Sequence, residues 1–366
     1  MLRRLWLVSV AAIVAAALLE LIPRFLFRTD ALEERLSRAA AAATDGLYRV
    51  HLGAARLSAL GRSLSARDVR VEPDPALLEQ RRRSGDPPRT LFIATSPAIR
   101  LTGLDPLAML RGDVATASIT VMEPRFGIFL DRTAPVKKPG APATMPHEQL
   151  RTLAHRLRID ELVVKQGSIR YSEKAGDGAR PGTIRFEKIE AVFRDITNEP
   201  KIQAERACAV DLHGLLAGTA PMTLSLRYEL SAPQLTLDYE GAVGTMDARA
   251  LNELLVNLKG IRLNAGVLDT TSYRFRVENG IVTGEVRMLY HGLDSEIVDK
   301  VTLERGFSEK LQTFLNTRFK VNAANPLGSD ATAKTIPVHR ARTPETGFIK
   351  FLWENLRAGV YETLGV

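Results

Sequence analysis

The chain has 366 residues, of which 45% are hydrophobic and 25% are charged. These values are typical of globular proteins and exclude a disordered chain. The length predicts two folded segments rather than one core. Lys and Arg number 50 against 42 Asp and Glu, a formal net charge of +8, which favours an anionic partner such as phospholipid or nucleic acid. Because Cys208 is the single cysteine, an intrachain disulfide and a cysteine metal cluster are excluded.

The N-terminus predicts a membrane anchor over residues 1–23. The stretch "LWLVSVAAIVAAALLELIP" follows Arg3 and Arg4 and is long enough to cross a hydrocarbon core of about 30 Å. A cleaved signal peptide is the alternative, since residues 15–17 are small enough for a cleavage site. We favour the uncleaved anchor because the apolar run continues beyond this point, and a long domain after a short basic tail is expected to be translocated.

A translocated body disfavours nucleic acid as the partner and matches the basic excess to phospholipid headgroups. Arg24 and Arg28 follow the anchor directly and are the candidate headgroup contacts. The predicted location is therefore a membrane crossed once, with most of the chain outside the cytoplasm.

Short helices are predicted between segments of strand pattern. Asp30 with Glu33 has the spacing of a capping box and indicates a helix directly after the anchor. Asp74-Pro75 and Asp105-Pro106 each place a capping side chain before a proline at the first helical position. The stretch "DARALNELLVNLKG" places leucines at one-sided helical spacing before Gly260, so it is expected to cover an apolar surface.

The strands alternate between apolar and polar residues, as expected for an antiparallel sheet with one dry face. "LRIDELVVKQGSIRYSE" is interpreted as a hairpin that turns at residues 165–167. Asn279-Gly280 is a second hairpin signal. The apolar positions of the later strands form one predicted face: Leu224, Leu226, Tyr228, Leu235, Leu237, Tyr239, Tyr273, Phe275 and Val277.

Two proline-rich stretches, 133–146 and 321–347, lack periodicity and are interpreted as linkers. They bound a membrane-proximal α+β segment over 24–132 and an antiparallel β domain over 147–320. The remaining residues, 348–366, have the spacing of an amphipathic helix. Two positions are open for it: docked on the sheet, or lying on a membrane surface.

The search for catalytic motifs finds little. "HEQLR" at His147 begins like a zinc-protease motif, but Arg151 stands where the second histidine is required. The sequence contains no nucleophile elbow, phosphate loop or dinucleotide fingerprint. We therefore predict a protein that is not an enzyme and that has no catalytic residue, metal or cofactor.

The order of these sequence segments resembles that of the AsmA-like family of bacterial envelope proteins over roughly residues 1–300. The pieces that carry the resemblance are "LRGD" before 119–124, then 159–171, 184–196 and 224–290. The resemblance implies a mainly β fold, in which an N-terminal transmembrane helix precedes a bent antiparallel, groove-like sheet with a few short amphipathic helices. It also implies a location in the bacterial inner membrane, crossed once, with most of the chain in the periplasm, and a role in phospholipid transport or outer-membrane biogenesis.

Residue chemistry gives an independent reason for such a groove, because each exposed CH₂ of an acyl chain costs about 0.8 kcal/mol in water. The expected partners are thus phospholipids, the inner membrane and other envelope proteins, with the nine apolar positions as candidate groove residues. The alternative function is an envelope scaffold or assembly factor that binds proteins through the sheet edges.

Overall fold

The computed structural model describes residues 29–58, 60, 62–105, 107–108, 111–135, 142–176, 179–298, 322–326 and 332–364. The predicted anchor over 1–23 and the headgroup candidates Arg24 and Arg28 lie outside these ranges. Among the described residues, no helix combines the length and the apolar character that crossing a membrane requires.

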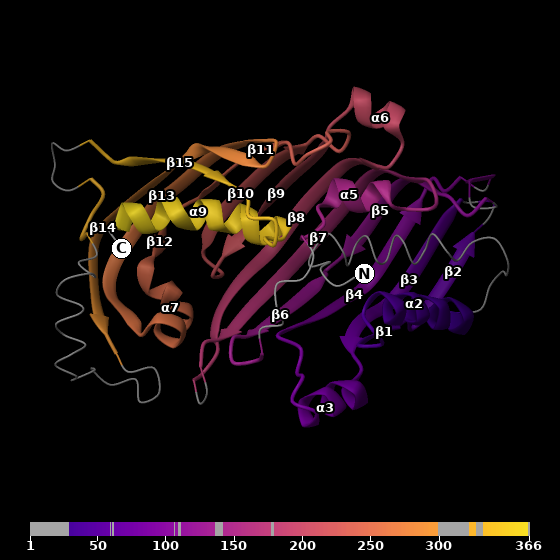
Figure 1. The fold of residues 1–366 in the computed structure, drawn as a ribbon, viewed down its shortest axis with the longest axis horizontal. Helices are drawn as coiled ribbons and strands as arrows, with labels where there is room; N and C mark the ends of the chain where they lie inside the picture. Colours follow the sequence, from indigo (N-terminus) through magenta and orange to yellow (C-terminus); the bar gives the residue numbers. More distant parts are fainter. Residues whose placement is uncertain are drawn as a thin grey trace.

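The fold is mainly β, and fifteen strands of the described chain belong to one curved sheet (Figure 1). Its path runs β1-β3-β4-β5-β7-β8-β9-β10-β11-β13-β14-β15, while β2, β6 and β12 pair beside it. The strands are β1 Tyr48–His51, β2 Ala54–Ser58, β3 Ser63–Pro73, β4 Thr90–Thr102, β5 Val114–Met122, β6 Arg125–Asp131, β7 Leu157–Lys174, β8 Gly182–Thr197, β9 Cys208–Leu216, β10 Ala220–Tyr228, β11 Leu237–Val243, β12 Met246–Asp247, β13 Ile261–Glu278, β14 Ile281–Ile297 and β15 Thr335–Ala341.

The helices expected after Asp30, after Asp74 and over 247–260 form, whereas most of the one expected after Asp105 lies outside the described residues. α3 begins after Asp74, whose carboxylate accepts hydrogen bonds from the backbone of Ala76 and Leu77. A 3₁₀ turn and α7 follow Asp247 and end at Gly260, which adopts the left-handed conformation (φ 68°) that favours glycine. The helices are α2 Thr29–Ala43, α3 Pro75–Arg83, α5 Pro146–Arg151, α6 Pro200–Glu205, α7 Asn252–Lys259 and α9 Phe348–Leu364.

The sheet is mixed, so the prediction of a purely antiparallel sheet is wrong at β7. β5 and β6 both pair with β7 in parallel. The connection between β6 and β7, described over 132–135 and 142–156, is longer than a hairpin turn, and parallel pairing of consecutive strands requires such a long connection. The part described as 142–145 lacks regular structure, as predicted, yet Ala143 and Met145 are buried.

The predicted hairpin at 165–167 is also wrong, because β7 is one strand of 18 residues. Gln166 takes a left-handed backbone conformation (φ 54°) in a bulge, where the register with β8 shifts between Val164 and Gly167. Glu190 of β8 holds the bulge, since its Oε1 accepts from the backbone N of Gln166 at 3.0 Å and from its Nε2 at 2.8 Å. A bulge inserts one residue and bends the strand without ending it.

This bulge belongs to a row that we call the crease, formed by Asp68 in β3, Glu123 between β5 and β6, Gln166 in β7 and Lys188 in β8. All four have positive φ, from 42° to 54°. The pairings on either side of the four residues place them at a similar height across β3 to β8, and the register shifts beside Gln166 and Lys188. Because a bulge bends its strand, the two bulges in β7 and β8 bend the sheet at the crease. Figure 1 shows the resulting curved strands.

One sheet crosses both predicted segments, 24–132 and 147–320, through the pairing of β5 and β6 with β7. The stretch 321–347, interpreted as a linker, contains β15, which pairs with β14. Its alternation, with Ile336 and Val338 buried, is too short to outweigh the surrounding prolines in the sequence pattern. The helix predicted at 348–366 forms as α9 and docks on the sheet, with Phe351 buried.

Candidate functional site

The nine candidate groove residues share one apolar cluster on one face of the sheet. Register explains this for the strand residues, since Leu226 lies opposite Tyr239 and Tyr239 lies opposite Phe275. Leu224 and Tyr273 are partly buried, whereas the other seven are buried. Sequence alternation therefore identified a real face.

Two glycines make room for the aromatic rings of this face. A Cβ at Gly241 would lie 2.4 Å from the Tyr273 hydroxyl oxygen and 2.4 Å from the Thr223 carbonyl oxygen. A Cβ at Gly284 would lie 2.6 Å from Phe275 Cδ1. Tyr239 and Phe275 then pack with ring centroids 4.9 Å apart, and burial raises the pKa of Tyr273 to about 12. The sequence signal was a glycine in each case at an inward position of an alternating strand.

The candidate face is covered by the chain itself. In Figure 1, α9 lies along the sheet in front of the later strands, and its Phe351 is buried in the same cluster. Tyr228 stacks on Phe348 with centroids 5.4 Å apart. α7 covers an apolar surface, as expected, but not this one: Leu251 and Leu255 pack on a separate cluster that contains Met288 and Tyr290.

Buried polar groups lie beneath this cover. His147 Nδ1 and the Tyr228 hydroxyl oxygen are 2.6 Å apart, and burial lowers the pKa of His147. Asn355 of α9 is fully buried and donates through Nδ2 to the Tyr239 hydroxyl at 3.0 Å. Asn355 Oδ1 is buried without a hydrogen-bond partner, which makes the fit of α9 on the sheet less favourable than a fully apolar contact.

A second apolar surface on the same side of the sheet was missed by the sequence analysis. It lies across β4, β6, β7, β8 and β9, where the register places apolar side chains opposite one another in two rows. All its members are only partly buried, and in Figure 1 the described helices lie to either side of β6. We call this surface the middle band: Phe92, Ile128, Tyr171 and Ile184 in one row, and Phe126, Ile169, Phe186 and Leu216 in the other.

The middle band was not recognised in the sequence because the apolar alternation of β7 changes phase. Within β7 the inward positions are Leu157 and Ile159, then Leu162 and Val164, then Gly167 and the odd residues that follow. Period two therefore loses phase twice within one strand, and a phase change looks like a turn in the sequence. The hydroxyl of Tyr171 donates to Glu173 Oε2 at 2.5 Å, and Glu173 pairs with Arg132, so the band ends at a polar rim.

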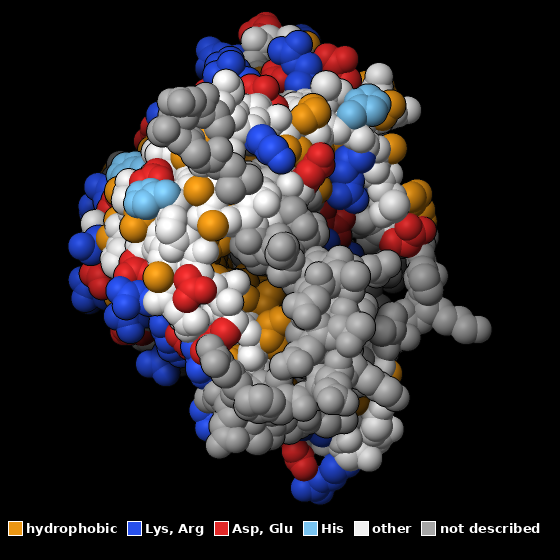
Figure 2. Space-filling model, turned by 90° about the vertical axis from the view of Figure 1, so that its left-hand side faces the viewer, with side chains coloured by type: hydrophobic (Ala, Val, Ile, Leu, Met, Phe, Trp, Pro, Cys, Tyr) orange, Lys and Arg blue, Asp and Glu red, His pale blue; other side chains and the backbone are white. Residues whose placement is uncertain are grey.

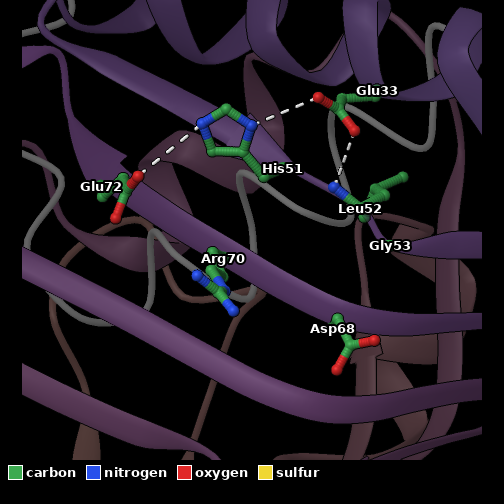
Figure 3. A pocket seen from close by; sticks show the side chains of 7 residues that line it. All are labelled: Glu33, His51, Leu52, Gly53, Asp68, Arg70 and Glu72. Carbon is green, nitrogen blue, oxygen red and sulfur yellow. Dashed lines mark hydrogen bonds and ion pairs between the residues drawn. The ribbon is translucent and has the colours of Figure 1, made fainter.

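A polar pocket of about 420 Å³ lies between α2 and the first strands (Figure 3). His51 stands between two carboxylates, with Nδ1 3.3 Å from Glu33 Oε1 and Nε2 3.7 Å from Glu72 Oε1. Glu33 Oε2 also accepts from the backbone N of Leu52 at 2.9 Å. Glu33, noted in the sequence for its capping-box spacing, thus fixes α2 to the end of β1, and the pocket is a docking contact of this helix.

Within the described ranges, no three His, Cys, Asp or Glu side chains are grouped as metal ligands. Viewed from the C-terminal end of the sheet, the surface is hollowed, and hydrophobic side chains are visible inside the hollow (Figure 2). The structure thus offers one apolar face in two parts, the α9-covered part and the middle band. Comparison of the chain with protein-family models and with curated proteins gives no match.

Proposed function

We propose that this protein binds phospholipid acyl chains on the concave face of its sheet and contributes to lipid transport or outer-membrane biogenesis in a bacterial envelope. It acts without catalysing a reaction, anchored in the inner membrane with its body in the periplasm. The observation that carries the proposal is the middle band, an unbroken set of partly buried aliphatic and aromatic side chains across five neighbouring strands.

The band has the chemistry that an acyl chain requires. Its two rows are apolar apart from the Tyr171 hydroxyl at the rim, whereas the residues between them point to the other face and include Arg170 and Arg185. Each CH₂ removed from water gains about 0.8 kcal/mol, so a trough of this kind lowers the cost of holding a lipid tail in an aqueous compartment. The resemblance to AsmA-like proteins supports the same function.

The nine residues first predicted to contact lipid differ from the middle band in their access to lipid. They lie under α9, so lipid reaches them only when α9 moves away. The unpartnered Asn355 Oδ1 on the inward side of α9 favours such movement, because a buried polar atom without a partner costs about 1–3 kcal/mol.

Site-specific photo-crosslinking in cells tests the proposal. A crosslinker at Ile169 or Phe186 is expected to capture phospholipid, while one at Arg170, the neighbour of Ile169 on the opposite face, is expected to capture none. A crosslinker at Phe275, which is 1% exposed, is expected to give less lipid than Ile169. Capture of protein alone at Ile169 and Phe186 would disprove lipid binding by the band.

That outcome would favour the second candidate function, an envelope scaffold. The observation on its side is β15, which ends the sheet path of the described strands and pairs there with β14 alone. A partner strand adding to β15 would use its outer backbone groups. Crosslinkers along β15, at Thr335 or His339, would then capture a protein of defined mass.

A further inference from the structure

Two leucines project from neighbouring turns at the N-terminal end of the sheet. Leu60, in the turn between β2 and β3, is fully exposed at 102%, and Leu107, in the connection between β4 and β5, is 65% exposed. A single exposed leucine is ordinary in a globular protein. Two of them on adjacent turns at one end of the molecule form an apolar contact surface.

The turns are fixed to one another. The backbone N of Leu104 donates to the Arg62 carbonyl at 3.0 Å, and Arg62 Nε donates to the Leu104 carbonyl at 2.6 Å. Asp105 Oδ1 accepts from the backbone N of Leu107 at 2.9 Å and from that of Ala108 at 3.2 Å. Leu104 and Ala108 are buried on either side. The outward position of Leu107 is therefore built into the turn.

Arginines surround the two leucines. Arg56 and Arg100 are exposed and lie opposite Ser65 from its two sides, so they share one face of the sheet. Arg62 and Arg111 are exposed in the turns themselves. The nearby carboxylates are occupied: Asp105 caps its own turn, and buried Asp113 lies 3.5 Å from Arg111 and accepts from the Arg156 backbone. The surface is complementary to anionic headgroups.

The same end of the molecule receives the N-terminal part of the chain. α2 begins at Thr29, and its Glu33 contacts Leu52, from which the chain continues into β2 towards Leu60. Figure 1 shows β2 and the start of α2 at the right-hand end. The apolar stretch 5–23 precedes this point in the sequence.

We propose that Leu60 and Leu107 insert into the surface of an anionic phospholipid bilayer, with Arg56, Arg62, Arg100 and Arg111 contacting the headgroups. This contact sets the N-terminal end of the concave face against the membrane, where lipid would enter or leave it. The inference rests on the membrane attachment in the proposed function, but it concerns a surface that the crosslinking experiment does not involve.

Depth-dependent fluorescence quenching tests this contact in the full-length protein reconstituted in vesicles. An environment-sensitive dye is attached to L60C, L107C or I281C in a C208A background, and the vesicles contain phosphatidylethanolamine, phosphatidylglycerol and a lipid quencher near the headgroup. Ile281 is 45% exposed and lies beside the turn between β13 and β14, at the other end of the sheet path. The dye is expected to be quenched about twofold more at positions 60 and 107 than at 281.

Two further measurements identify the source of the contact. Replacing phosphatidylglycerol with phosphatidylcholine, or introducing R56Q with R100Q, is expected to reduce the quenching at 60 and 107 and to leave 281 unchanged. Equal quenching at all three positions, or shielding of 60 and 107 only by a second protein, overturns the membrane contact. Either result leaves lipid capture at Ile169 unaffected, so the two proposals fail separately.

Discussion

Leu226 and Arg227 are neighbours in β10 whose side chains lie on opposite faces. Leu226 is 6% exposed within the cluster under α9, whereas Arg227 is exposed on the polar face. L226D is expected to lower the free energy of unfolding by about 3–5 kcal/mol, because it buries a charge without a partner. R227Q is expected to change it by less than about 0.5 kcal/mol. Urea unfolding followed by circular dichroism measures both, and comparable losses would contradict the assignment of faces.

Gly241 allows Tyr273 to lie flat on the sheet. G241A is expected to cost about 1–3 kcal/mol, because the added methyl group would meet both the Tyr273 hydroxyl and the Thr223 carbonyl. Gly127 in β6 is the matched control, since the nearest atom to a Cβ there is 4.0 Å away. G127A is expected to be neutral or slightly stabilising, and thermal unfolding of both variants and the wild type measures the difference. A neutral G241A would mean that Tyr273 lies elsewhere.

His147 gives the stability a pH dependence. Burial lowers its pKa below the ordinary 6.5, so near neutral pH it is uncharged in the folded state. As pH falls below about 6.5 the unfolded chain takes up a proton that the folded chain resists, and stability is lost at up to about 1.4 kcal/mol per pH unit until the folded pKa is reached. H147Q is expected to be less stable at pH 7.5 but to show a flatter decline.

Urea titrations of the wild type and H147Q at several pH values between 7.5 and 5 compare the two slopes. The other histidines contribute equally to both proteins, so the difference isolates His147. Parallel curves would show that His147 takes up a proton in the folded state as easily as in the unfolded chain.

At the scale of elements, α9 covers part of the apolar face but buries a polar atom that has no hydrogen-bond partner. N355L removes the buried oxygen that lacks a partner but also the Nδ2 hydrogen bond to the Tyr239 hydroxyl, so a net stabilisation of about 0–2 kcal/mol is expected. G359L is expected to push α9 off the sheet, since even a Cβ there would lie 2.4 Å from Val286 Cγ2.

If α9 controls access to the face beneath it, the two variants change lipid capture in opposite directions. A photo-crosslinker at Tyr273 is expected to capture less phospholipid in N355L and more in G359L than in the wild type. Ile169, in the middle band, serves as the control position and is expected to change little. The same yield at Tyr273 in all three proteins would exclude α9 as a movable cover.

At the scale of the whole molecule, the sequence predicted individual helices and turns better than it predicted how the strands pair and where the helices dock. Helix caps and the hairpin at Asn279-Gly280 depend on neighbouring residues, and the structure confirms them at α3, α7 and between β13 and β14. The single face of nine residues followed from the regular period of β10, β11 and β13. These features depend on residues that are close in the sequence, so a short stretch is enough to predict them.

The features that were missed depend on distant partners. Glu190 of β8 holds the bulge at Gln166, and no window around Gln166 contains it. The parallel pairing of β7 depends on the long connection that precedes it, and β15 is a strand because β14 lies beside it. The cover by α9 likewise unites residues more than a hundred positions apart, as in the contact of Asn355 with Tyr239.

The crease also constrains which changes of length the chain can accept. Gln166 and Lys188 lie at register shifts in the adjacent strands β7 and β8, so the two bulges together set how these strands pair beyond the crease. Deleting Gln166 alone would shift half of β7 by one residue against both neighbours and exchange its two faces. Insertions and deletions in these strands are therefore expected to occur in matched sets, while the turns that connect them vary freely in length.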